Sequence, residues 1–146
     1  MSCRKLSLIH IYRVGGAERR ERLERYTGEL EIDGALGDLI SSYSHGMRQK
    51  LALCAAFVHE PRLLLLDEPF VGLDPKAAHT CKQLMRALCA RGGAIFFSTH
   101  VLEVAQTLCD RVAIIQNGRL LVEGETQTVC RDESLESVFL ELTEDA

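Results

Sequence analysis

Four consecutive leucines, Leu63 to Leu66, are followed at once by Asp67, Glu68 and Pro69. A short, continuous apolar run is typical of a parallel strand that is buried on both faces. Carboxylates are costly to place beside a core, so Asp67 and Glu68 predict a functional site at the end of this strand. The alternative interpretation is a strand that simply ends in an acidic turn.

The rest of the chain predicts helices alternating with strands. A second apolar run, 94–98, predicts a second buried strand. Periodicity and capping residues predict helices at 17–30, 46–58, 75–91, 101–109 and 134–142. Asn117-Gly118 between two apolar runs predicts a hairpin with a type I′ turn, because that turn needs two positive φ angles. We therefore expect an α/β fold with a parallel sheet at its core and a C-terminal hairpin and helix.

Composition excludes several classes of protein. A formal net charge of -4 argues against nucleic acid as a partner, because such binding rests on a basic surface. No apolar stretch approaches the roughly 18 residues that a membrane-spanning helix needs. The six cysteines form no C-x-x-C pair, which favours buried free thiols in a reducing cytoplasm over a metal site.

Polar residues at two strand ends are the candidates for catalysis. Parallel strands end at a common sheet edge, so His100, just beyond the second apolar run, is expected near Asp67 and Glu68. In nucleotide hydrolases an aspartate at this place holds Mg²⁺, usually through water, and a neighbouring carboxylate orients or deprotonates the attacking water. Asp67 suits the metal and Glu68 the water. A structural role for His100 is the alternative.

Two helix starts are the candidates for binding. Ser44-His45-Gly46-Met47 offers free backbone N–H groups, a hydroxyl and the positive end of a helix dipole, which together favour an anion. Capping of the helix by Ser44 explains the same residues without any ligand. Asp74 before Pro75 is explained equally well as the N-cap of the next helix.

Four motifs in this order resemble an ABC transporter ATP-binding subunit. They correspond to its signature motif, Walker B, D-loop and H-loop, and are Ser44-His45-Gly46-Met47, 63–68, 71–74 and Ser98-Thr99-His100. The resemblance extends from about Ala17 to the C-terminus. It implies a P-loop NTPase-like fold, with 15–60 forming part of the helical subdomain and 61–146 the C-terminal part of the ATPase core.

The resemblance also implies a site shared between two subunits that bind ATP and Mg²⁺. Ser44, His45, Gly46 and Met47 would close over ATP held by a second ATP-binding subunit, arranged head to tail. Glu68 would be the general base, His100 the γ-phosphate sensor, Asp67 the Mg²⁺ residue, and Asp74 a link between the two sites. A membrane-spanning transporter subunit would hold the chain at the inner face of the cell membrane, in an exporter-type system.

The sequence departs from the family pattern in three places. Tyr43, His45 and Met47 replace the usual Leu, Gly and Gln of the signature motif. The sequence contains no Gly-Lys-Ser or Gly-Lys-Thr, so it has no Walker A motif. The first glutamine is Gln49, so no glutamine stands before the signature motif to serve as the Q-loop. We therefore expect a C-terminal fragment that is inactive alone, in which residues 1–14 are uninformative and not native to the fold.

Two other functions fit the same motifs. One is a soluble ABC-type ATPase acting in DNA repair or on ribosomes, although the chain has neither the coiled-coil heptads nor the basic extension expected of one. The other is a non-catalytic remnant that does nothing with ATP. Co-purification with a membrane subunit separates a transporter subunit from the first, and nucleotide binding separates it from the second.

Overall fold

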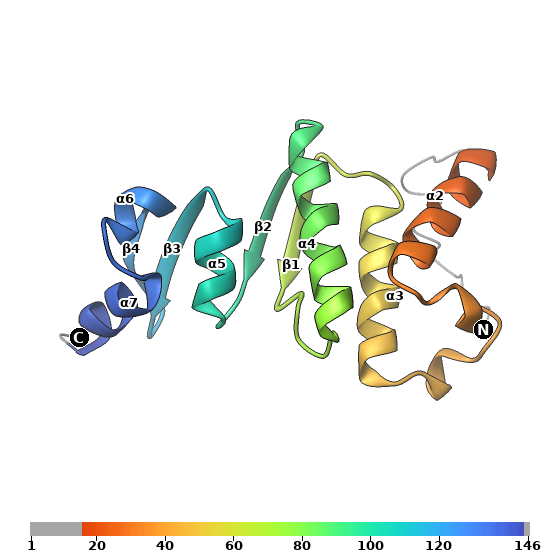
Figure 1. Ribbon diagram of the computed structural model, residues 1–146, viewed down its shortest axis with the longest axis horizontal. Helices are drawn as coiled ribbons and strands as arrows, with labels where there is room; N and C mark the ends of the chain where they lie inside the picture. Colours follow the sequence, from red (N-terminus) through yellow and green to blue (C-terminus); the bar gives the residue numbers. More distant parts are fainter. Residues whose placement is uncertain (1–15, 145–146) are drawn as a thin grey trace, which may run out of the picture. The chain divides into compact units, whose positions relative to one another are not determined.

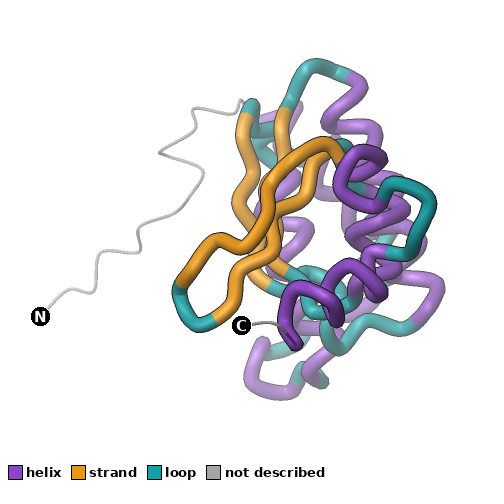
Figure 2. The backbone as a smooth tube through the Cα atoms, turned by 90° about the vertical axis from the view of Figure 1, so that its left-hand side faces the viewer, coloured by secondary structure: helices purple, strands orange, loops and turns teal. Residues whose placement is uncertain are grey.

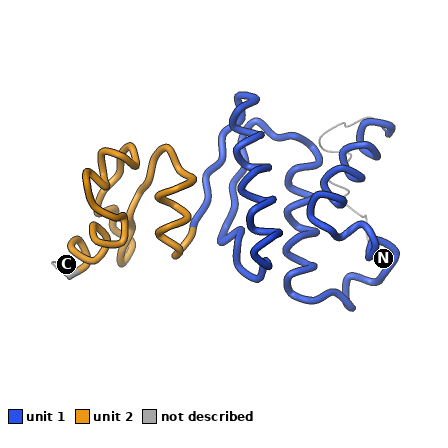
Figure 3. The backbone as a smooth tube through the Cα atoms, viewed as in Figure 1, with its two compact units in different colours: residues 1–98 blue, residues 99–146 orange. Residues whose placement is uncertain are grey.

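The computed structural model describes residues 16–144, so the predicted N-terminal segment 1–14 lies outside the described residues. The chain divides after Ser98 into two compact units, drawn in blue and orange in Figure 3. The predicted domain boundaries at 14 and 60 follow the family resemblance and stay predictions. No helix among the described residues is long and apolar enough to cross a membrane.

The first unit begins with two helices that pack together. Helix α2 spans Gly16–Glu29 and α3 spans His45–Phe57, close to the predicted ranges. Two 3-10 turns, η1 (Asp33–Ala35) and η2 (Ile40–Ser42), connect them. Tyr26 of α2 and Phe57 of α3 are 1% exposed, and their ring centroids lie 5.9 Å apart. This aromatic contact forms the centre of a small helical core.

The same unit contains the predicted parallel strands. Strand β1 (Leu63–Asp67) pairs in parallel with β2 (Ala94–Ser98) (Figure 1); Figure 2 draws the strands of the chain in orange. Helix α4 (Pro75–Ala90) connects the strands and packs one apolar face inward. The buried residues of that face are Ala77, Cys81, Leu84, Met85 and Leu88. The register pairs Asp67 with Ser98, so the last residues of the two strands lie side by side.

The prediction that both strands are buried on both faces is wrong for one face. Leu64 is only 7% exposed, whereas Leu63, Leu65 and Phe96 are 59%, 67% and 66% exposed. Alternate residues of a strand point to opposite faces. Among the described residues this sheet has only two strands, and α4 contacts it on one face, so the other apolar face stays open.

The second unit is a hairpin flanked by short helices. Its elements are α5 (Leu102–Leu108), β3 (Arg111–Gln116), β4 (Arg119–Glu125), α6 (Thr126–Cys130) and α7 (Leu135–Glu144). The turn residues Asn117 and Gly118 have φ angles of 50° and 74°, which confirms the predicted type I′ geometry. The five residues of α6 are too short to show helical periodicity, so the sequence did not predict this helix.

The cysteines behave largely as predicted. Cys54, Cys81 and Cys130 are buried free thiols, whereas Cys89 is exposed. Burial raises the pKa of Cys54 and of Cys81 to about 12, because the low-dielectric interior disfavours the thiolate. These two thiols are therefore packing residues rather than nucleophiles at neutral pH.

Candidate functional site

The carboxyl end of β1 is organised by one hydroxyl from β2. Ser98 Oγ donates a hydrogen bond to Asp67 Oδ1. The backbone N–H of Glu68 donates to Ser98 O at 3.2 Å and to Ser98 Oγ at 3.1 Å. Asp67, Glu68 and Ser98 thus meet where the two strands end.

Glu68 adopts a left-handed backbone conformation, which Glu31, Glu60 and Arg131 share elsewhere in the chain. Its φ angle is 45°, in the left-handed region that a side chain with a Cβ disfavours by about 1–2 kcal/mol. Such residues persist only where their surroundings hold them, and they cluster at functional sites. The left-handed backbone turns the chain sharply after the strand, so that Glu68 is half-buried where β1 ends.

The start of α3 places the predicted phosphate-binding residues on a helix N-terminus. Ser44 is the N-cap, and its side chain accepts a hydrogen bond from Met47 N at 3.2 Å. The capping interpretation is therefore confirmed, while the role in binding an anion stays a prediction. Ser44 and His45 are exposed, so the hydroxyl and the helix end face solvent.

The loop between β1 and α4 lies directly against the first turns of α3. A Cβ on Gly46 would come within 2.6 Å of Gly72 O, so the loop backbone occupies the space of a side chain there. Gly72 has a φ of +79°, and the His45 ring lies where its Cβ would be, 2.3 Å from Cδ2. Gln49 Nε2 donates to Pro69 O at 3.1 Å. Three residues of α3 thus hold the loop that follows Glu68.

Asp74 ends this loop and joins two helices. Its Oδ1 accepts from Ala77 N at 2.8 Å, which caps α4 as predicted, and Lys50 Nζ of α3 lies 2.9 Å from Oδ2. The Lys50 side chain is only 13% exposed. The Ala77 N–H and, after it, the Lys50 ammonium lower the pKa of Asp74, because both favour the carboxylate.

His100 lies in the second unit. It follows β2 by two residues, and the neighbouring Thr99 Oγ1 accepts from Val101 N at 3.1 Å where α5 begins. The pairing of β1 with β2 confirms that His100 follows a strand beside the Asp67 strand. Its role toward a phosphate stays a prediction.

The donor atoms at the end of β1 suit a hard cation bound together with a ligand. Asp67 is exposed and presents carboxylate oxygens, the atoms that Mg²⁺ prefers. Within residues 16–144 no group of three or more His, Cys, Asp or Glu could hold a metal by itself. One or two carboxylates completed by waters and substrate phosphates are the usual protein arrangement for Mg²⁺, so Asp67 fits such an ion, weakly with water alone and more tightly with a nucleotide.

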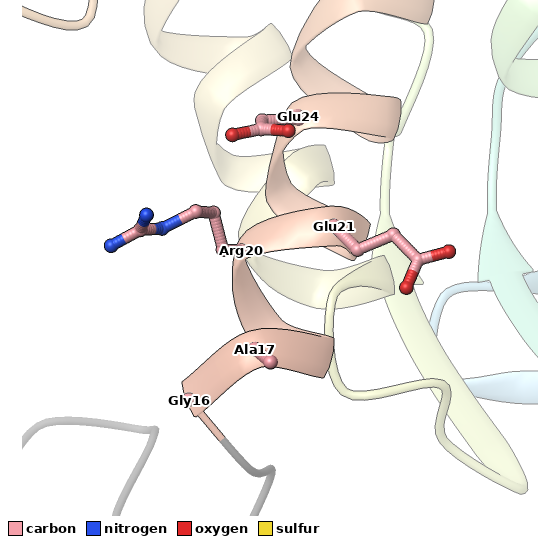
Figure 4. A pocket seen from close by; sticks show the side chains of 5 residues that line it. All are labelled: Gly16, Ala17, Arg20, Glu21 and Glu24. Atoms are coloured by element: carbon pink, nitrogen blue, oxygen red, sulfur yellow. The ribbon is translucent and has the colours of Figure 1, made fainter.

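A hollow beside the first turns of α2 offers no competing site. It is lined by Gly16, Ala17, Arg20, Glu21 and Glu24 (Figure 4). The labelled side chains of Arg20, Glu21 and Glu24 point in different directions and do not converge on a common point. A ligand would find no set of polar groups aimed at it there.

Comparison with known proteins identifies the family. A family model described as "AAA domain, putative AbiEii toxin, Type IV TA system" matches residues 11–104. The Nod factor export ATP-binding protein I of Rhizobium meliloti is 39% identical over 114 residues, which are 78% of this chain and 32% of that protein. The uncharacterized ABC transporter ATP-binding protein YdbJ of Bacillus subtilis (strain 168) is 37% identical over 84% of this chain and 39% of its own length.

A solved structure agrees with these relatives. The structure titled "Structure of ATP binding subunit of ABC transporter" has a TM-score of 0.84 and 33% identity, covering 98% of this chain and 65% of that chain. This chain belongs to the ABC transporter ATP-binding family. It spans about a third of the length of the relatives named above.

Three residues of this ABC ATP-binding chain were missed by sequence reasoning as contributors to the site. The sequence places Ser98 in the H-loop motif and Gly72 in the D-loop motif, and Lys50 is one of the four lysines outside any Walker A motif. Each acts through a partner at least 24 positions away in the sequence, as in the ion pair of Lys50 with Asp74. Local patterns carry no signal for such contacts.

Proposed function

We propose that this chain supplies the signature motif and the water-activating side of an ATP site in an ABC transporter ATP-binding subunit. The observation that carries the proposal is that one loop, 68–74, connects both parts. It begins at Glu68 beside Asp67, and it contacts Gly46 at the start of α3. One loop thereby connects the residues that would serve one ATP site with the residues that would serve the ATP site of a second subunit.

Each acidic residue has a distinct role in the proposal. Mg²⁺ bound with ATP would neutralise charge that develops on the phosphates. Asp67 would hold this ion through water. Glu68 would accept a proton from the attacking water, since it lies on the neighbouring position and its backbone is fixed by Ser98. His100 would contact the γ-phosphate.

The exposed start of α3 would bind the nucleotide of a second subunit. Ser44 and Gly46, with His45 and Met47, would approach the phosphates of ATP held by the partner's phosphate-binding loop. The Met47 N–H is already used by Ser44, so neighbouring N–H groups and the Ser44 hydroxyl would meet the phosphate. Asp74, fixed by Lys50, would carry the state of one site to the other.

The names of the relatives support a membrane transporter as the partner. A membrane-spanning transporter subunit and a second ATP-binding subunit would complete the assembly, and the chain would lie peripherally at the inner membrane face. Relatives that are named for Nod factor export support an exporter. Co-purification of the chain with a membrane subunit tests this part of the proposal, and its recovery free of any membrane protein would contradict it.

ATP turnover tests the division of the site. We expect a polypeptide of these 146 residues to hydrolyse ATP at the rate measured in buffer without protein. The reason is that no Gly-Lys-Ser/Thr sequence is present to hold the β- and γ-phosphates. Glu68→Gln is the matched control, because glutamine has the shape of the glutamate side chain but lacks the carboxylate that would accept the proton. Steady turnover by the wild-type chain that disappears in Glu68→Gln would contradict the proposed division.

A further inference from the structure

We infer that Ser98 is a positioning residue for both acidic groups at the end of β1: its hydroxyl orients the Asp67 carboxylate toward Mg²⁺ and fixes the backbone of Glu68. The inference rests on the proposed function of Asp67 and Glu68. Ser98 is the last residue of β2 and lies opposite Asp67 in the parallel register. Its side chain contacts both acidic residues.

The chemistry of a hydroxyl suits this double contact. A serine hydroxyl has one proton to donate and two lone pairs that accept. The proton goes to Asp67 Oδ1, which leaves a lone pair for the Glu68 N–H at 3.1 Å. Because a carboxylate accepts and an N–H only donates, the direction of both hydrogen bonds is fixed. One side chain therefore sets the orientation of two groups.

The contact to Asp67 concerns metal binding. A hydrogen bond to Oδ1 restricts rotation of the carboxylate and leaves Oδ2 for an ion or its water. Groups that orient a metal-binding side chain are worth about 10–100-fold in metal affinity in known sites. Ser98 would thus orient the Asp67 carboxylate without touching the metal.

The contact to Glu68 concerns the backbone. Its φ of 45° is unfavourable for glutamate, so other interactions must hold it. The Glu68 N–H is shared between Ser98 O and Ser98 Oγ, at 3.2 and 3.1 Å. Strand pairing alone would supply only the carbonyl. The hydroxyl adds the second acceptor, so it has a role beyond the pairing of β1 with β2.

Ser98→Thr and Ser98→Val form a matched pair that tests the inference. Both side chains are β-branched and favour strands. Threonine keeps the hydroxyl, and valine has a methyl group in its place. Ser98→Ala serves as a second variant without a hydroxyl if the valine does not fold. Amide NMR spectra of the whole chain, titrated with Mn²⁺ alone, give the apparent metal affinity from the broadening of the Asp67 and Glu68 signals. Hydrogen exchange of the Glu68 amide reports its protection.

We expect the threonine variant to match the wild type. The valine variant should bind Mn²⁺ about 10-fold more weakly, and its Glu68 amide should exchange several-fold faster. Equal Mn²⁺ affinity and equal exchange in the valine and threonine variants would overturn the inference while leaving the proposed role of Asp67 intact. A wild-type chain whose Asp67 and Glu68 signals do not respond to Mn²⁺ would instead overturn the proposed metal role, and the inference with it.

Discussion

The carboxyl end of β1 and the turn of the β3–β4 hairpin use the same left-handed backbone for different reasons. In the hairpin, Asn117 and Gly118 have φ angles of 50° and 74°, and both residue types tolerate them well. At the end of β1, Glu68 has a φ of 45°, which glutamate tolerates poorly. The stability of the fold explains why Asn117 and Gly118 stand in the hairpin turn, because both tolerate a positive φ. It does not explain the choice of glutamate at position 68.

The two regions also differ in what holds them. The hairpin turn is specified by two adjacent residues, because their preferences and the strand twist agree. The end of β1 is held by residues distant in sequence, such as Ser98, 30 positions from Glu68, and Gly46 of α3. The hairpin turn is specified by its own residues, whereas the turn at Glu68 needs a scaffold of distant residues. Mutations that disturb one scaffold contact should therefore affect the two regions unequally.

The largest effect is expected at Gly46. Alanine in a helix normally stabilises relative to glycine by about 0.5–1 kcal/mol, but a Cβ at Gly46 would lie 2.6 Å from Gly72 O. We expect Gly46→Ala to lower the free energy of unfolding by about 2 kcal/mol, because the backbone of the loop at Gly72 must move to make room for the Cβ. Urea denaturation measures this change. Gly28→Ala in α2, where nothing lies within 4 Å, is the control and should stabilise; a stabilised Gly46→Ala would contradict the close approach of the loop.

A smaller effect is expected from relief of backbone strain at Glu68. Glu68→Ala and Glu68→Gly both remove the carboxylate, but only glycine accepts the left-handed φ freely. We expect the glycine variant to be more stable than the alanine variant by about 1 kcal/mol in urea denaturation. At the hairpin, Asn117→Gly should stay within about 0.5 kcal/mol of the wild type, because asparagine already tolerates this φ. Equal stability of the two Glu68 variants would show that position 68 is not strained.

The smallest effect is expected at Asp74 and depends on pH. Its pKa is lowered in the folded chain by the Ala77 N–H and by Lys50. The resulting stabilisation is complete above the unfolded pKa of about 3.9 and is lost as the pH falls through the lower, folded pKa. We expect the stability difference between the wild type and Asp74→Asn to shrink as the pH falls below about 4. Asp38→Asn controls for loss of a charge, and a pH-independent difference for Asp74→Asn would contradict the prediction.

Much of the fold was predictable from local patterns. The parallel strands, the caps at Ser44 and Asp74, and the Asn117-Gly118 turn each depend on neighbouring residues, and the structure confirms them. The family was predictable because its motifs are contiguous and ordered. Roles carried over from the family, such as that of His100, stay predictions.

Other features depend on contacts that a sequence does not display. The ion pair of Lys50 with Asp74 joins α3 to the start of α4, and nothing near Lys50 in the sequence indicates its partner. The open face of the sheet was missed for a related reason. A leucine run indicates a strand that can be buried, but burial of Leu65 depends on which elements cover it, and α4 contacts only one face.

We propose that the end of β1 binds a metal ion and the water near it, and that the hairpin turn does not. Mn²⁺ titration of the wild-type chain and of Asp67→Asn, followed by amide NMR, tests it directly, because asparagine can keep the hydrogen bond from Ser98 and loses only the charge. We predict broadening at Glu68 before any at Asn117, and its loss in Asp67→Asn. Broadening at Glu68 that persists in Asp67→Asn, or that appears first at Asn117, would contradict the claim.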